Sequence, residues 1–216
     1  MSALFVALVT AMLAVHLVAR ARGADPSRCD RFAAASVARA QAVTGSGERV
    51  VVIGDSYSAG LGLNDPVSSW PSRLAGRVRV AGFSGSGFSR HASTCSDVSF
   101  ATRARSAVRG GDLVVVEGGL NDYNQPSADI RAGFDRLMGQ LRGHRIVVVG
   151  PPSAPSRAHA VLRVDELLTD LSERYGVAYV RTSGWSLSYL DDGLHLTPAG
   201  HRTFGDAVAQ EIATLS

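Results

Sequence analysis

Three residues of this 216-residue chain have the types and spacing from which a nucleophile and its base can be built. Ser56 follows Asp55 just beyond the apolar run 49–53, and Asp192 and His195 stand with two residues between them near the other end of the chain. A serine hydroxyl becomes nucleophilic when a base takes its proton, and a histidine base needs a third group to hold its tautomer. The sequence therefore predicts Ser56 as nucleophile, His195 as base and Asp192 as the residue that orients the imidazole.

Acyl transfer also needs hydrogen-bond donors for the negative charge that develops on the carbonyl oxygen. The N–H of Ser56, a glycine N–H from the stretch GFSGSG and the side-chain amide of Asn121 can supply three donors. Gly85 suits the second role because it has no side chain and lets the backbone approach a substrate. Gly82 and Gly87, in the same stretch, are the alternatives.

Short apolar runs rich in valine alternate with helical stretches along the chain. The runs are 49–53, 78–81, 113–116, 146–149 and 177–180; the helical stretches are 30–43, 69–74, 98–108, 127–141, 156–175 and 198–215. Such runs are typical of strands buried on both faces. The alternation predicts an α/β fold, a parallel sheet covered by helices on both sides. Polar residues after the strands should then meet at the carboxyl edge of the sheet, where α/β proteins bind ligands.

These residues resemble the motifs of the SGNH hydrolases, also called the GDSL esterase/lipase family. The resemblance covers roughly residues 49–215 and lies in Gly54-Asp55-Ser56, Gly85, Gly119-Leu120-Asn121-Asp122 and Asp192-Gly193-Leu194-His195, which occur in the family's order. It implies a three-layer α/β/α domain with a flavodoxin-like sheet of five parallel strands. It also implies a Ser-His-Asp triad, an oxyanion hole formed by Ser56, Gly85 and Asn121, and catalysis without a metal or another cofactor.

The sequence departs from the family pattern at three places, one of which is the unusually glycine-rich stretch around Gly85. Tyr57 stands where the family's name has leucine, and Asp191 adjoins the predicted triad acid. Only Asp192 has two residues between itself and His195, so Asp191 is not the expected partner.

Several side chains beside the motifs are candidates for an acyl or sugar pocket. We predict substrate contacts for Asp55, Tyr57, Phe83 and Tyr123; Phe88, Trp185 and Tyr189 flank the same edge. Core packing is the alternative for each of these aromatic residues. The connection 61–70 is too short for a long lid, which favours short acyl groups.

Other function classes lack their motifs. The elbow Gly-x-Ser-x-Gly is absent around Ser56, and without any lysine the chain has no phosphate-binding Gly-Lys-Ser/Thr loop. The net charge is +3, but its arginines are scattered among acidic residues, so we expect no nucleic-acid partner. Arginine without lysine, with abundant alanine, glycine and valine, is typical of a GC-rich bacterial genome.

The N-terminal part of the chain has a different composition. Residues 3–19 are almost wholly apolar, and we predict that 1–24 form a signal peptide or membrane anchor, 25–47 a helical linker and 48–216 the hydrolase domain. The domain is then secreted or membrane-anchored, outside the cytoplasm; a cytosolic chain with a buried N-terminal helix is the alternative. Cys29 and Cys95 form either one disulfide or two separate buried thiols.

The predicted function is that of a serine esterase that hydrolyses short acyl esters of glycans, lipids or small molecules. An acyltransferase that passes the same acyl group to a cell-envelope sugar or lipid is the first alternative. A glycan- or lipid-binding module without catalytic activity is the second.

Overall fold

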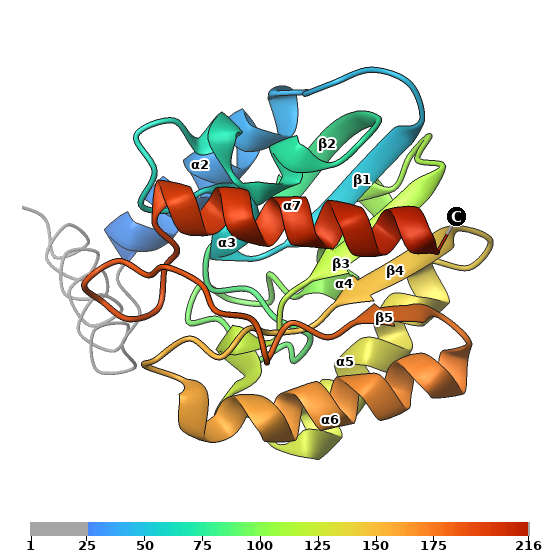
Figure 1. Ribbon diagram of the computed structural model, residues 1–216. Coiled ribbons are helices and arrows are strands. Elements are labelled where there is room, and N and C mark those ends of the chain that lie inside the picture. The colour runs from blue at the N-terminus through green and yellow to red at the C-terminus, as the bar shows by residue number, and fades with distance from the viewer. Residues whose placement is uncertain (1–25, 216) are drawn as a thin grey trace, which may run out of the picture.

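Five parallel strands form the central sheet of the computed structural model, which describes residues 26–215 (Figure 1). The strands are β1 Arg49–Gly54, β2 Arg77–Gly82, β3 Leu113–Glu117, β4 Arg145–Val149 and β5 Ala178–Val180, in the spatial order β2-β1-β3-β4-β5. This flavodoxin-like order confirms the expected fold. All of β3, and all of β1 except its first residue, are buried, as the valine-rich runs predict.

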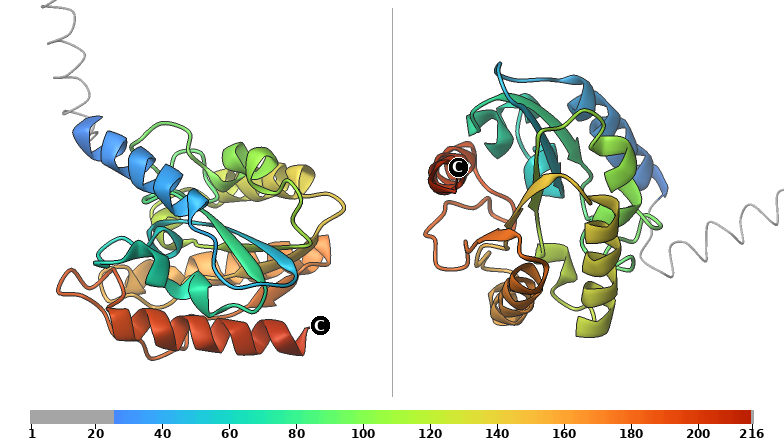
Figure 2. Two further views of the ribbon diagram at one scale, coloured as in Figure 1. Left: turned by 90° about the horizontal axis from the view of Figure 1, so that it is seen from above. Right: turned by 90° about the vertical axis from the view of Figure 1, so that its right-hand side faces the viewer.

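Helices cover both faces of the sheet (Figure 2). They are α2 Pro26–Gln41, α3 Ser56–Ala59, α4 Phe100–Ala107, α5 Ser127–Gln140, α6 Ala158–Tyr175 and α7 Pro198–Thr214, with 3₁₀ turns η1 Pro66–Ser68, η2 Trp70–Arg73 and η3 Leu120–Asp122. The prediction of an α-helix over 69–74 is wrong. This segment is η2, because Pro66 and Pro71 remove backbone donors and leave only short 3₁₀ turns between them.

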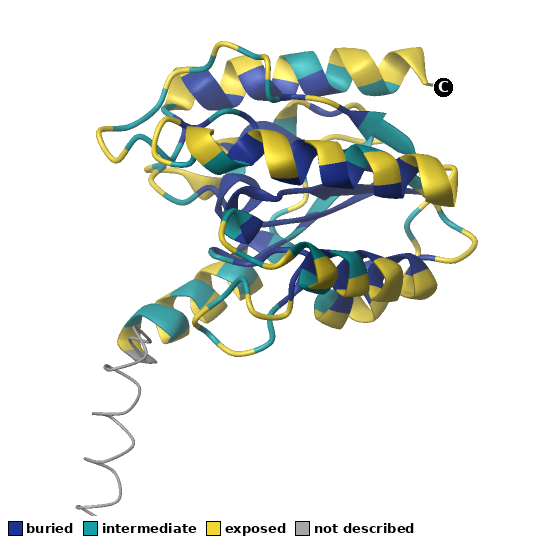
Figure 3. Cartoon of the chain, turned by 90° about the horizontal axis from the view of Figure 1, so that it is seen from below, coloured by how far each residue is buried: buried dark blue, intermediate teal, exposed yellow. Residues whose placement is uncertain are grey.

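Two apolar cores, one on each face of the sheet, lie between the sheet and its helices. One core joins the sheet to α4, α5 and α6, and the other joins it to α3, η2 and α7. Alternate residues of β1 divide between them: Val51 and Ile53 belong to the first core, Val50 and Val52 to the second. The helices bury one side and expose the other (Figure 3). The sheet is therefore a rigid support for the loops at its edges.

Helix α2 is attached to the domain at both ends. A disulfide joins Cys29 of α2 to Cys95, which decides between the two alternatives for these cysteines. Beyond the helix, Thr44 pairs with Val78 in an antiparallel bridge at the edge of β2. The predicted signal or anchor, residues 1–24, lies outside the described residues. Within 26–215 no helix has the length and apolar character needed to cross a membrane.

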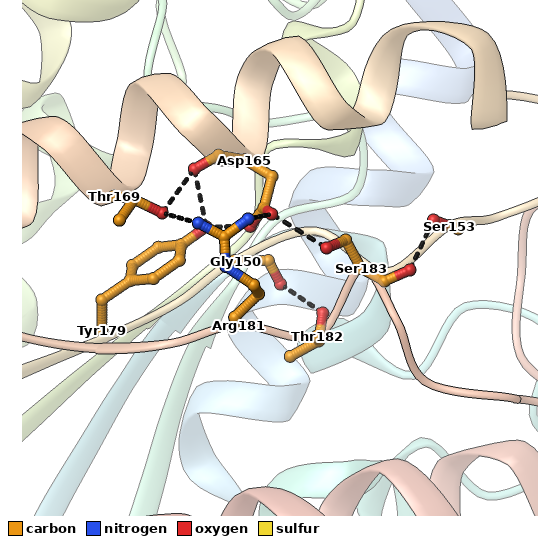
Figure 4. A network of polar contacts seen from close by, with 8 residues as sticks. All are labelled: Gly150, Ser153, Asp165, Thr169, Tyr179, Arg181, Thr182 and Ser183. Carbon is orange, nitrogen blue, oxygen red and sulfur yellow. Dashed lines mark hydrogen bonds and ion pairs between the residues drawn. The ribbon is translucent and has the colours of Figure 1, made fainter.

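A polar network fixes the segment that leads to the predicted base (Figure 4). Asp165 of α6 is fully buried and accepts hydrogen bonds from Tyr179 Oη at 2.5 Å and Ser183 Oγ at 2.8 Å. Arg181 also forms an ion pair with Asp165. Ser153 Oγ, from the loop after β4, donates to Ser183 O at 2.6 Å. These contacts hold the ends of β4 and β5 and their loops against α6.

Candidate active site

Ser56 lies at the carboxyl edge of the sheet, where it is the first residue of the helix α3 that follows β1. Asp55 caps α3 by accepting a hydrogen bond from Tyr57 N–H at 2.9 Å. A Cβ on Gly54 would stand 2.1 Å from Ser58 Oγ, so only glycine allows the strand to turn this closely into the helix. This turn places the predicted nucleophile at the N-terminus of α3.

Asp192 and His195 form the predicted acid–base pair. His195 Nδ1 lies 2.5 Å from Asp192 Oδ2, and Asp192 Oδ1 accepts the N–H groups of Leu194 and His195 at 2.8 and 2.9 Å. Partial burial raises the pKa of Asp192, but the hydrogen bonds from His195 and from the two N–H groups outweigh it and bring this pKa down to about 2. Asp192 is therefore an anion that holds one imidazole nitrogen and leaves the other for a reacting group.

Tyr57 joins α3, the nucleophile helix that begins with Ser56, to the loop of the base, which contains Asp192 and His195. Its hydroxyl donates to Leu194 O at 2.6 Å, and its ring packs edge-on against His201 and Phe204 of α7. Within residues 26–215, Ser56 Oγ has no hydrogen-bond partner, so the structure does not show the expected bond to His195. Such bonds are often loose in free enzymes and tighten only when the substrate binds.

The oxyanion turn, residues 83–86, explains the glycine at position 85. Ser86 N–H donates to Phe83 O at 3.1 Å, and Gly85 has φ +85°, which fits the third residue of a type II turn. Gly82 and Gly87 have packing roles instead, because a Cβ would meet Ala59 N at 2.7 Å from Gly82 and Asp122 Oδ2 at 2.5 Å from Gly87. This packing favours Gly85 among the three glycines.

Two of the three predicted oxyanion donors have free N–H groups. In the described part of the chain nothing accepts a hydrogen bond from the backbone N–H of Ser56 or Gly85. The third donor is occupied: Asn121 Nδ2 lies 3.0 Å from Asp55 Oδ2 and 2.9 Å from Ser86 O. These contacts draw together the ends of β1, β2 and β3.

Sequence reasoning missed a buried acid next to the nucleophile helix. Glu117, the last residue of β3, accepts a hydrogen bond from Ser58 Oγ at 2.6 Å, and Trp70 Nε1 donates to the same hydroxyl at 3.1 Å. Burial raises the pKa of Glu117 to about 7 and, together with the nearby Glu117 charge, raises that of Asp55 well above its usual range. The available signal for this buried acid was its position in the sequence, as a single charged residue at the end of a valine run.

Arg103 was also missed, because nothing in its local sequence marks it. Its guanidinium donates to the backbone oxygens of Ala81 and Gly54 and to Ser86 Oγ, the last two at 3.0 and 2.9 Å. It also donates to Val98 O at 3.0 Å. Arg103 therefore clamps the ends of β1 and β2 to the oxyanion turn, and burial lowers its pKa to about 10.

The predicted substrate-contact residues fall into two groups. Asp55 and Tyr57 have exposed fractions of 1%, so we reassign them from substrate contact to the positioning of Asn121 and of the His195 loop. Phe83 is buried and meets Phe32 of α2 edge-on. Tyr123 is half-buried beside Asn121 and remains a predicted pocket residue.

The other aromatic residues near this edge pack mainly in the cores. Phe88 is fully buried and stacks on Phe134, and Trp185 packs edge-on against Phe204. Tyr189 is partly buried beside the second core. In the described region, no three His, Cys, Asp or Glu side chains are grouped as a metal site requires.

Comparison with known proteins identifies the family. The model of the GDSL-like Lipase/Acylhydrolase family matches residues 52–203. The chain belongs to this family. It is therefore an SGNH-type serine ester hydrolase, in agreement with the motifs in its sequence. No curated protein matches the sequence.

Solved structures resemble this acylhydrolase in fold. The native M. smegmatis aryl esterase is 21% identical with a TM-score of 0.66, and a putative arylesterase from Agrobacterium tumefaciens is 22% identical with a TM-score of 0.64. A carbohydrate acetylesterase from Sinorhizobium meliloti is 19% identical, also with a TM-score of 0.64. Each comparison covers 79% of this chain and 100% of the other.

Proposed function

We propose that this acylhydrolase cleaves short acyl esters through a Ser56–His195–Asp192 triad and an acyl-enzyme. Ser56 Oγ attacks the ester carbonyl carbon while His195 Nε2 takes the hydroxyl proton. The oxyanion is held by the N–H groups of Ser56 and Gly85 and by the Asn121 amide, which exchanges its hydrogen bond to Asp55 or to Ser86 O for one to the substrate oxygen. When the intermediate collapses, His195 gives its proton to the departing alcohol. Water then attacks the acyl-enzyme by the same steps and releases the acid and free Ser56.

The Asp192–His195 pair is the observation that carries this proposal. An aspartate that is hydrogen-bonded to Nδ1 and to two backbone N–H groups serves to fix an imidazole in one tautomer. The hydrogen bond from Tyr57 to Leu194 O ties this loop to the helix that begins with Ser56. The free N–H groups of Ser56 and Gly85 add the donors that a tetrahedral intermediate requires.

Acetyl esters are the first substrates to test. After α3, the connection to β2 has only the short 3₁₀ turns η1 and η2 and contains no long lid, which favours small acyl groups. The names of the similar structures, aryl esterase and carbohydrate acetylesterase, suggest phenols and sugars as the alcohol part.

The test is active-site labelling combined with turnover. We expect a fluorophosphonate to add to Ser56, as mapped by mass spectrometry, and 4-nitrophenyl acetate to be hydrolysed. Both reactions should be lost in Ser56→Ala and retained in Ser106→Ala, which removes an exposed hydroxyl on α4. A folded domain that shows neither adduct nor turnover would refute the proposal and favour a binding module.

The acyltransferase alternative uses the same acyl-enzyme and differs only in the acceptor. Adding a sugar or glycerol acceptor to the ester assay distinguishes the two. A hydrolase yields free acetate at any acceptor concentration, whereas a transferase yields an acetylated acceptor at the expense of acetate.

We also propose that the domain functions outside the cytoplasm. The Cys29–Cys95 disulfide supports an oxidising compartment, where such bonds persist. Fractionation of cells that express the full chain, with thiol labelling before and after reduction, tests this location. A cytoplasmic protein with both thiols free would overturn it.

A further inference from the structure

Arg157 precedes α6 and stacks on an aromatic ring beside the proposed active site. Its guanidinium carbon lies 3.6 Å from the centre of the Tyr123 ring. Contact with the face of an aromatic ring attracts a cation and holds the planar guanidinium in one orientation. The His159 ring also packs edge-on with Tyr123.

The hydrogen-bond donors of Arg157 are unused. Nothing among residues 26–215 accepts a hydrogen bond from its guanidinium, and its Nε is buried without a partner. Other arginines nearby are engaged: Arg163 donates to Tyr123 O at 3.0 Å and Arg181 forms an ion pair with Asp165. The guanidinium of Arg157 is thus positioned but not neutralised.

The start of α6 increases the positive charge around Arg157. Arg157 occupies the N-cap position of this 18-residue helix, where side chains that accept hydrogen bonds are usual, and its first turn contains no acidic residue. The free N–H groups of a helix N-terminus carry partial positive charge. An anion bound by Arg157 would therefore also be favoured by the helix.

Two contacts locate Arg157 at the rim of the proposed site. The preceding residue, Ser156, donates its N–H to Gly193 O at 2.9 Å, and Gly193 lies between Asp192 and His195. Tyr123, on which Arg157 stacks, follows Asn121 by two residues. Arg157 is thus connected to the loop of the base through the backbone of Ser156, and to the loop of the third oxyanion donor through its stacking on Tyr123. No ion pair joins Asp192 to Arg157 among the described residues, and the Asp192 carboxylate is instead hydrogen-bonded to His195.

We propose that Arg157 determines specificity by binding an anionic group of the ester substrate, such as a carboxylate, phosphate or sulfate. This inference rests on the proposed esterase function. A fixed guanidinium binds such groups through two parallel N–H donors, which an uncharged substrate of the same shape cannot use. The enzyme then prefers esters of acidic sugars or other acidic compounds over their neutral analogues.

Matched pairs of esters test this preference. One pair, 3-acetoxybenzoate and 3-acetoxybenzamide, places the charge on the alcohol part; the other, mono-4-nitrophenyl succinate and 4-nitrophenyl butyrate, places it on the acyl part. We expect kcat/KM to favour the anionic member of at least one pair by about tenfold, the value of one charge-assisted hydrogen bond. Arg157→Gln should abolish this preference and Arg157→Lys should retain part of it.

The controls separate charge recognition from a structural effect. Arg174→Gln removes an exposed charge at the other end of α6 and should leave the preference unchanged. Tyr123→Phe should preserve the preference, and Tyr123→Leu, which removes the stacked ring, should reduce it. If the unmutated enzyme shows no preference in either pair, or if Arg157→Gln slows neutral and anionic esters equally, Arg157 has no such role. Absence of turnover of every ester would instead refute the proposed function.

Discussion

Replacing Glu117 by glutamine tests whether the acid beneath the nucleophile helix is protonated in the native protein. The carboxyl is fully buried, one of its oxygens accepts a hydrogen bond from Ser58, and its other oxygen, Oε1, has no partner. The variant Glu117→Gln keeps the shape and the acceptor for Ser58 but cannot ionise. It therefore isolates the free-energy cost of a negative charge at this position.

The size and direction of the effect follow from the pKa of Glu117. Burial raises it from 4.5 to about 7, so between these values the folded state holds a proton that the unfolded state has lost. Stability must then fall as pH rises through this window, by about 3 kcal/mol in all. We expect Glu117→Gln to remove that loss. Its free energy of unfolding should exceed that of the unmutated protein at about pH 8 by up to this amount.

Urea unfolding measured between about pH 4.5 and about pH 8 provides the assay. Asp122, whose pKa burial raises to about 7, and Asp55 remain in the variant, so its pH dependence should weaken rather than disappear. Glu211→Gln on α7, an exposed site, is the matched control and should follow the unmutated protein. An unchanged pH dependence in Glu117→Gln, or a loss of stability that is larger at high pH, would refute the reasoning.

Three further predictions concern the site and its attachment. The lysine of Arg103→Lys cannot bond both strand ends and the oxyanion turn, so kcat should fall roughly tenfold with little change in KM. Arg105→Lys, at an exposed position of the same helix, is the control and should match the unmutated enzyme in steady-state assays. Replacing both Cys29 and Cys95 by serine opens a link across 66 positions and should cost about 4 kcal/mol in urea unfolding, and a smaller change would contradict the chain-entropy argument. Asp192→Asn should lower kcat by about 10³ to 10⁴ with ester binding retained, and near-normal turnover would show that another group orients the base.

Local sequence determined the five strands and the candidate residues of the triad. Valine runs too short for helices predicted all five strands, because a strand buried on both faces needs apolar side chains at every position. The pair Asp192 and His195 was recognisable because two residues that interact within one turn lie close in the chain. Ser56 was recognisable because a buried strand ends there in a tight glycine turn.

Tertiary structure alone decided the contacts between residues far apart in the chain. Glu117 and Ser58 are separated by 59 positions and Arg103 and Gly54 by 49, and no local pattern relates them. Burial likewise reassigned Tyr57, since the exposure of an aromatic side chain depends on what the rest of the chain packs over it. Periodicity and short motifs record interactions along the chain, whereas the buried charges and clamps around this site exist only once the parallel strands bring their carboxyl ends together.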